Sequence, residues 1–132
     1  MEQNSGEDGM EMHIETRLSD QIARYLDLAT TEAKVTATNM ANIDTPGYRA
    51  VGIDFAAEIR AALQNVDSGP ENRHPVRVSE VGGQVARPDG NDVSMDRESL
   101  NLAEAQLKFK TGVALLRSEY QRVMDAIHAD SK

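Results

Sequence analysis

Three histidines are the first candidates for chemistry, because imidazole binds metals and titrates near neutral pH. His13 lies in the N-terminal segment, His74 in a polar loop and His128 in the last turn of a helical pattern. Their spacing brings no two of them onto one helical turn or one strand edge. We therefore expect solvated histidines and no metal or acid–base site.

An acid-rich stretch, DGNDVSMDRE at residues 89–98, contains the carboxylates of a calcium loop. An EF-hand loop needs acidic residues at alternating positions and a glycine at the sixth position, where the chain turns sharply. Here Gly90 directly follows the first aspartate, so the order fails. We expect a turn that leads into the N-terminus of a helix.

Other catalytic patterns are missing from the sequence. There is no cysteine, which excludes thiol catalysis, disulfides and cysteine-bound metals. No glycine-rich phosphate loop follows a strand, and no Gly-x-Ser-x-Gly elbow occurs. We expect no enzymatic activity, no cofactor and no small-molecule substrate.

Composition favours a long, thin helical molecule. The 132 residues fit one domain, and 39% are apolar, but only 4% are aromatic and none is tryptophan, which is lean for an enzyme with a shaped pocket. The net charge of −8 argues against nucleic acid as a partner, since binding phosphates requires a basic face. Six acids and one base fall within residues 1–20, so residues 1–14 are expected to form an acidic flexible tail.

Residues 15–43 are predicted to form an amphipathic helix of roughly 40 Å. Its apolar or small stripe steps by three or four residues: Ile14, Leu18, Ile22, Tyr25, Ala29, Ala33, Thr36, Met40 and Ile43. The second half, VTATNMANI at residues 35–43, carries no charge on any face. Since a solvated helix normally has a charged outer face, we expect contacts on more than one side there, including Ala37 and Ala41 beside the stripe.

Residues 96–128 are predicted to form a second long helix with a heptad-like stripe. Ser94 or Asp96 is the expected N-cap, and Gly112 is expected to mark a close approach of a neighbouring backbone. From the two stripes alone, the core of an ordinary small helical bundle is as good an interpretation as a long pair of helices. The stripe consists of Leu102, Ala105, Phe109, Val113, Leu116, Tyr120, Val123 and Ile127.

Residues 44–95 are predicted to connect the helices through a loop and a β-hairpin. A polar loop spans residues 64–75, and residues 76–81 alternate like a strand. Gly82-Gly83 is a turn signal, and residues 84–93 are the expected second strand. Residues 15–132 would then form a single domain.

The stretch NMANIDTPGYRA at residues 39–50 predicts a sharp corner. Asn39 and Asn42 suit the end of a helix, where carbonyl groups without partners need donors. Proline followed by glycine at the two central positions is typical of a type II turn. The motif consists of Asn39, Asn42, Thr45, Pro46, Gly47 and Tyr48.

This stretch resembles the Ala-Asn-x-x-Thr-Pro-Gly-Tyr signature of the flagellar rod and hook axial proteins. GIDFAAEI at residues 52–59 and the stretch from residue 89 to residue 127 are similar to the proximal rod members of that family. The resemblance covers roughly residues 17–60 and 88–127. The Arg-x-Tyr-Gln-Ala-Asn-type C-terminus usual in the rod protein FlgC is absent.

The resemblance implies a mainly α fold in which the two terminal helices pair as an antiparallel coiled coil. It implies a structural subunit of the periplasmic proximal rod, a homo-oligomer stacked helically into a hollow shaft. Export would use the flagellar type III system without a cleaved signal peptide, and the N-terminus indeed lacks the basic start and apolar run of such a peptide. The implied partners are the adaptor FliE, the rod proteins FlgC and FlgF, the export gate and the membrane-ring base. Two alternatives are another rod axial protein similar to FlgC and a soluble two-helix coiled-coil adaptor.

Overall fold

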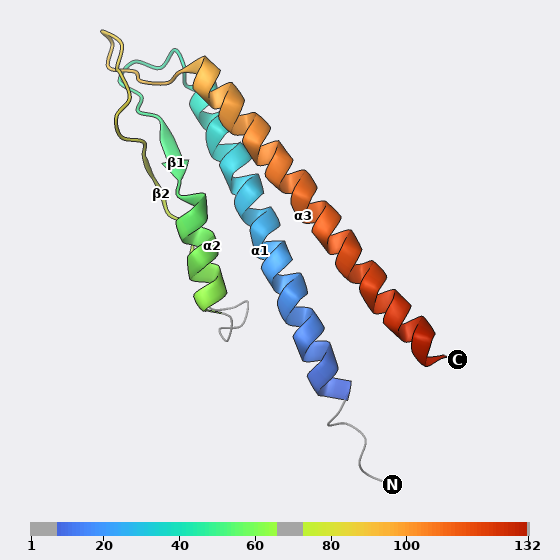
Figure 1. Ribbon diagram of the computed structural model, residues 1–132. Coiled ribbons are helices and arrows are strands. Elements are labelled where there is room, and N and C mark those ends of the chain that lie inside the picture. Colours follow the sequence, from blue (N-terminus) through green and yellow to red (C-terminus); the bar gives the residue numbers. More distant parts are fainter. Residues whose placement is uncertain (1–7, 66–72, 132) are drawn as a thin grey trace.

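A computed structural model describes residues 8–65 and 73–131, with side chains from Arg17 onward. The elements are α1 (Asp8–Ala41), β1 (Val51–Ile53), α2 (Phe55–Gln64), β2 (Val78–Glu80) and α3 (Met95–Asp130). α1 and α3 lie side by side and run in opposite directions, while α2 and the two strands lie along the other side of α1 (Figure 1). The fold is thus mainly helical. Within the described ranges, no helix has both the length and the apolar character that crossing a membrane requires.

α1 is longer at its start and shorter at its end than the predicted helix of residues 15–43. It begins at Asp8, so residues 8–14 of the predicted tail belong to the helix, and residues 1–7 lie outside the described residues. The helix ends because Asn42 closes its last turn: its backbone N–H donates to the carbonyl oxygens of Thr38 and Asn39. Its side-chain amide also donates to Thr38 O at 2.8 Å. Ile43 therefore lies in the following turn.

α3 begins one residue before the predicted start and ends two residues after the predicted end. Of the two expected caps, Ser94 is the one used, since its hydroxyl oxygen accepts from the Arg97 N–H at 3.5 Å. Asp96 lies in the first turn, where a negative charge favours the positive end of the helix dipole.

Small side chains let α1 and α3 approach closely. Ala29 of α1 and Ala105 of α3 are both 1% exposed. A Cβ atom at Gly112 would lie 2.6 Å from Leu26 Cδ2 and 3.0 Å from Tyr25 Cδ1, so only glycine fits without movement. Gly112 does mark a close approach, as predicted. The atoms nearest to it are side-chain atoms of α1, whereas backbone atoms were expected. The seam positions recur every seven residues: Ile22, Ala29 and Thr36 on α1, and Glu98, Ala105, Gly112 and Glu119 on α3.

The predicted hairpin between residues 76–81 and 84–93 is wrong. β2 pairs antiparallel with β1, in the register Val51↔Glu80 and Ile53↔Val78. Gly82 and Gly83 do form a turn, but it leads toward the 87–91 region, and the structure assigns no strand to residues 84–93. That segment contains Pro88, which has no N–H for a ladder, and it folds into a turn of its own. β2 therefore pairs with the edge of β1.

Helix α2 was not predicted, although local signals for it exist. Asp54 caps it, with Oδ1 accepting from the Ala57 N–H at 3.0 Å. The Phe55 ring meets the Tyr25 ring edge-on, with centroids 5.4 Å apart. Lys108 Nζ of α3 lies 4.1 Å from the centroid of the Phe55 ring and also binds Glu32 of α1 at 2.9 Å. This cluster connects the first turn of α2 to both long helices.

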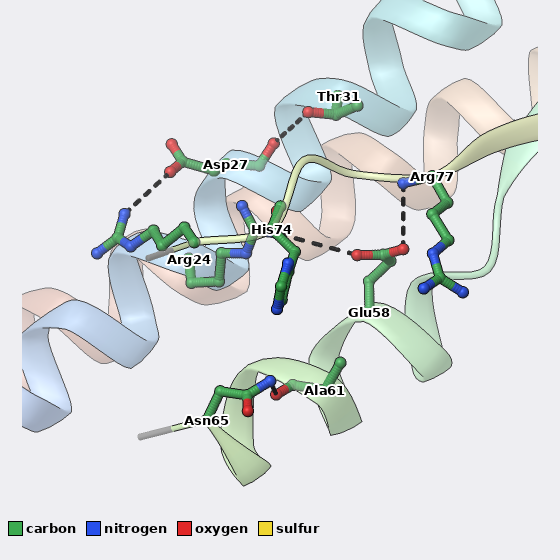
Figure 2. A network of polar contacts seen from close by, with 9 residues as sticks. Arg24, Asp27, Thr31, Glu58, Ala61, Asn65, His74 and Arg77 are labelled. Carbon is green, nitrogen blue, oxygen red and sulfur yellow. Dashed lines mark hydrogen bonds and ion pairs between the residues drawn. The ribbon is translucent and has the colours of Figure 1, made fainter. Parts of the chain in front are cut away.

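A polar network holds the segment that leads into β2 against α1 and α2 (Figure 2). Arg24 of α1 donates to the His74 carbonyl oxygen at 3.1 Å and lies 3.9 Å from the Glu58 carboxylate. Glu58 of α2 in turn accepts from the Arg77 N–H at 3.2 Å. His74 contributes its backbone to this network, and the residue is exposed, as predicted.

Candidate functional site

The Pro-Gly corner after α1 has the predicted turn. Gly47 has a φ of 75°, which side chains other than glycine rarely adopt. The Tyr48 N–H donates to the Thr45 carbonyl oxygen at 3.2 Å, which closes the four-residue turn. Both features are those of a type II turn with proline and glycine at its centre, and the prediction is confirmed.

A second turn, at residues 87–91, packs against this corner. The Gly47 N–H donates to the Asp89 carbonyl oxygen at 2.8 Å. A Cβ atom at Gly90 would lie 3.4 Å from Gly47 Cα, so the two glycine backbones are nearly in contact. The Arg87 guanidinium donates to the Ile43 carbonyl oxygen. The stretch considered above as a calcium loop is therefore a turn that leads into α3, as expected.

Asn39 is the centre of the corner. It is only 1% exposed. Its amide donates to the Val51 carbonyl oxygen at 2.8 Å and to Glu98 Oε2 at 3.1 Å. Its carbonyl oxygen accepts from the Val51 N–H and from the Tyr48 hydroxyl, both at 3.0 Å. Asn42 satisfies a helix-end carbonyl as predicted, whereas Asn39 instead binds β1, Tyr48 and α3.

Asn91 and Asp92 complete the corner from the other side of the chain. The buried Asn91 amide donates to the carbonyl oxygens of Asn42 and Thr45, at 2.9 and 2.8 Å. Asp92 Oδ1 accepts from the Ala50 N–H at 2.6 Å, and Oδ2 lies 3.2 Å from Arg49 Nε. The sequence-based prediction missed Asn91, Asp92 and Glu98 as corner residues, because polar residues just before a helix or in its first turn normally face solvent.

The hydrogen bonds of the corner hold three elements together. Burial raises the pKa of Tyr48 above its usual 10.0, and the carboxylates of Glu98 and Asp92 raise this pKa further. Tyr48 therefore stays protonated and keeps donating to Asn39. Among the described residues, no group of three or more histidine, cysteine or acidic side chains could hold a metal ion. The arrangement locks the end of α1, the start of β1 and the start of α3 together.

The predicted packing residues fall into three classes. On α1 and its end, Ile22 and Ala29 are buried, Tyr25, Met40 and Ile43 are half-buried, and Leu18, Ala37 and Ala41 are exposed. On α3, Leu102, Val113, Leu116 and Val123 are half-buried. Phe109, Tyr120 and Ile127 are 45%, 59% and 56% exposed, so the single chain leaves part of the predicted stripe uncovered.

Further large apolar side chains of α3 are exposed outside the predicted stripe. Leu100 and Leu107 are 60% and 66% exposed, and Leu115 and Met124 are about half exposed. Uncovered apolar side chains in such number are typical of a surface that binds other proteins.

Comparisons with known proteins give the family. No protein-family model matches the chain. The chain is 33% identical over 130 residues to the flagellar basal body rod protein FlgB of Cereibacter sphaeroides, covering 87% of this chain and 99% of that protein. It is 31% identical over 117 residues to FlgB of Proteus mirabilis, covering 75% and 85% of the two chains. It is 28% identical over 124 residues to FlgB of Escherichia coli, covering 79% of this chain and 88% of that protein. With its Pro-Gly corner and paired long helices, the chain belongs to the FlgB family of flagellar basal body rod proteins.

Proposed function

We propose that the chain is a structural subunit of the proximal rod, and that its copies stack helically into a hollow drive shaft next to the membrane ring and the export gate. Membership of the FlgB family supports a place in the rod. Helical stacking requires, in addition, surfaces that a single copy leaves uncovered. The structure offers such surfaces along both long helices.

The observation that carries the proposal is the amount of uncovered surface. Eight large apolar side chains of α3 are 41% or more exposed in the single chain. Only six apolar residues are buried among those described, and three of them are alanines. Contacts with neighbouring copies would cover the rest of the apolar surface.

The pairing of α1 and α3 is proposed to be an antiparallel coiled coil. The seven-residue spacing of the buried seam positions on both helices supports it, since heptads keep one face toward the partner. Residues 15–132 would then act as one axial domain, with the corner setting the angle at which β1 leaves α1. Because the corner residues are hydrogen-bonded to three elements, every copy would have the same angle.

Export and the direct neighbours are proposed from the resemblance alone. The chain would leave through the flagellar type III system without losing a signal peptide, and would contact FliE, FlgC, FlgF and the export gate at the base of the rod. No enzymatic step is part of the proposal.

Lysine substitutions on the uncharged face of α1 test the proposal. Ala37 and Ala41 are exposed in the single chain, so Ala37→Lys or Ala41→Lys should change its stability by no more than about 0.5 kcal/mol. In a packed rod, the same lysine would enter a subunit contact without a partner, at several kcal/mol per copy. We expect exported subunits but few hook-bearing basal bodies.

The control is Ala57→Lys, which places the same charge on an exposed position of α2. Export is measured by detecting the subunit outside the cytoplasm, and assembly by counting hooks on isolated basal bodies. Normal hook numbers in both α1 variants would contradict an assembly face at residues 35–43.

A concentration series separates a rod subunit from a soluble adaptor. An adaptor would form a defined small oligomer, whereas a rod subunit would show weak, non-cooperative helicity alone and long assemblies at high concentration. The physical reason is that two helices bury too little apolar area to offset the entropy of ordering them. A sharp two-state thermal melt of the purified monomer would contradict this expectation.

A further inference from the structure

The pairing of β1 with β2 leaves one edge of β1 without a strand beside it. Val51 lies opposite Glu80, and Ala50 lies opposite Val81 in the same register. The Val81 N–H donates to the Ala50 carbonyl oxygen at 2.9 Å. Hydrogen-bonded and non-hydrogen-bonded pairs alternate along an antiparallel ladder, so Val51 turns its backbone groups away from β2. The N–H and the carbonyl oxygen of Val51 therefore need partners from another element.

The Asn39 side chain takes the place of a third strand at this edge. Its Nδ2 donates to the Val51 carbonyl oxygen at 2.8 Å, and its Oδ1 accepts from the Val51 N–H at 3.0 Å. One amide thus satisfies both backbone groups of one strand residue, as a neighbouring strand would. The match holds in only one orientation of the amide. Rotating the amide by half a turn would place oxygen against oxygen and N–H against N–H, so both bonds would be lost.

Two side chains from other parts of the chain bind the ends of this amide. Glu98 Oε2 accepts from Asn39 Nδ2 at 3.1 Å, and the Tyr48 hydroxyl donates to Asn39 Oδ1 at 3.0 Å. A carboxylate can only accept hydrogen bonds, so it attracts the amide nitrogen and repels the amide oxygen. A hydroxyl both donates and accepts, and it would tolerate either orientation. Of the two side chains, only Glu98 discriminates between the orientations.

We infer that Glu98 is a positioning residue: its carboxylate orients the Asn39 amide, and the oriented amide fixes which residue of β1 binds to α1. Glu98 is 2% exposed and Asn39 is 1% exposed, so water cannot readily replace either partner. Glu98 lies in α3, 59 positions after Asn39. The register between β1 and α1 is therefore set only when the start of α3 has docked. The inference rests on the proposed function in one respect, since its assays use assembled rods.

Exchanging the amide and the carboxylate between the two positions tests the inference. Asn39→Asp places two carboxylates within hydrogen-bond distance and should lower the number of hook-bearing basal bodies by about tenfold or more. Glu98→Gln alone keeps an acceptor for the Asn39 amide and should lower this number by less than about twofold. When both changes are combined, the new amide can donate to the new carboxylate. The number should then be at least about threefold higher than with Asn39→Asp alone.

The control combines Asn39→Asp with Glu119→Gln. Glu119 is another buried glutamate of α3, 6% exposed, but its carboxylate binds Arg122 at 2.7 Å. This combination should show no recovery. Equal recovery in the control, or no recovery when Asn39→Asp is combined with Glu98→Gln, would overturn the inference.

Hydrogen exchange gives a second test that does not use Asn39→Asp. Glu98→Met keeps a side chain of similar length but offers only a weak acceptor, whereas Glu98→Gln keeps a good one. In assembled rods, the Val51 amide should exchange at least about tenfold faster with Glu98→Met than with Glu98→Gln. Rods that form from Glu98→Gln but not from Glu98→Met would support the inference equally.

Equal exchange in the two variants would show that Glu98 only fills space. That result would overturn the inference and leave the proposed function intact. Basal bodies that contain no copy of the chain, even unaltered, would instead refute the proposed function.

Discussion

Gly47→Val is expected to stop rod assembly through backbone strain alone. Gly47 has a φ of 75°, and a Cβ atom built there would have no other atom within 4 Å. The cost therefore does not come from a clash of the Cβ atom with other parts of the fold. An L-residue in the left-handed region costs about 1–2 kcal/mol, and a β-branched side chain lies at or above the upper end of this range.

The chain cannot relieve this strain cheaply. Rotating φ at Gly47 to a negative value would break the Tyr48 N–H bond to Thr45 and the Gly47 N–H bond to Asp89. Each such bond contributes about 0.5–1.5 kcal/mol, so either route costs about 2–3 kcal/mol in every subunit. That is a large share of the stability of a domain this size.

The assay compares swimming speed and the number of hook-bearing basal bodies at equal expression. Gly47→Asn should retain most function, because asparagine tolerates positive φ. Gly82→Val is the second control, since Gly82 also has open space but no positive φ. We expect loss of swimming for Gly47→Val only. Normal swimming of that variant, or equal defects in Gly47→Val and Gly47→Asn, would refute the reasoning.

Three further predictions concern the corner and the helix seam. Asn39→Ala removes four hydrogen bonds and leaves the buried Glu98 carboxylate without its donor, so the corner should lose about 3 kcal/mol. Hydrogen exchange of the corner amides in assembled rods measures this loss, and unchanged exchange would contradict it. Gly112→Leu should force α1 and α3 apart at about 1–3 kcal/mol, because even a Cβ atom meets Leu26 at 2.6 Å; a helical circular dichroism signal as stable as that of the unaltered chain would count against it. The raised pKa of Tyr48 means that its contribution to stability is complete below about pH 10 and is lost as the pH rises further. Tyr48→Phe should lack this alkaline loss in a pH series of amide exchange, and an identical pH profile would show that Tyr48 does not cause it.

The sequence alone determined the features whose causes lie within a few residues. The Pro46-Gly47 turn, the Ser94 cap and the helical character of both long segments all depend on neighbours one to four positions away. α2 belongs to this class as well. Its cap at Asp54 and its apolar spacing from Phe55 to Ile59 were readable, and the prediction of a loop there overlooked them.

Only the tertiary structure decided which partners meet across long stretches of chain. A short strand such as β2 has no local preference between a partner at residues 84–93 and one at residues 51–53; the free edge beside the corner decides. Asn39 and Glu98 are surface residues by type, and they are buried because each supplies the hydrogen bond that the other needs across 59 positions. The apolar residues of α3 likewise lie on more than one face of the helix. α1 packs against the face that contains Ala105 and Gly112, because close approach of the two helices requires small residues. The larger apolar side chains of α3 are left for other contacts.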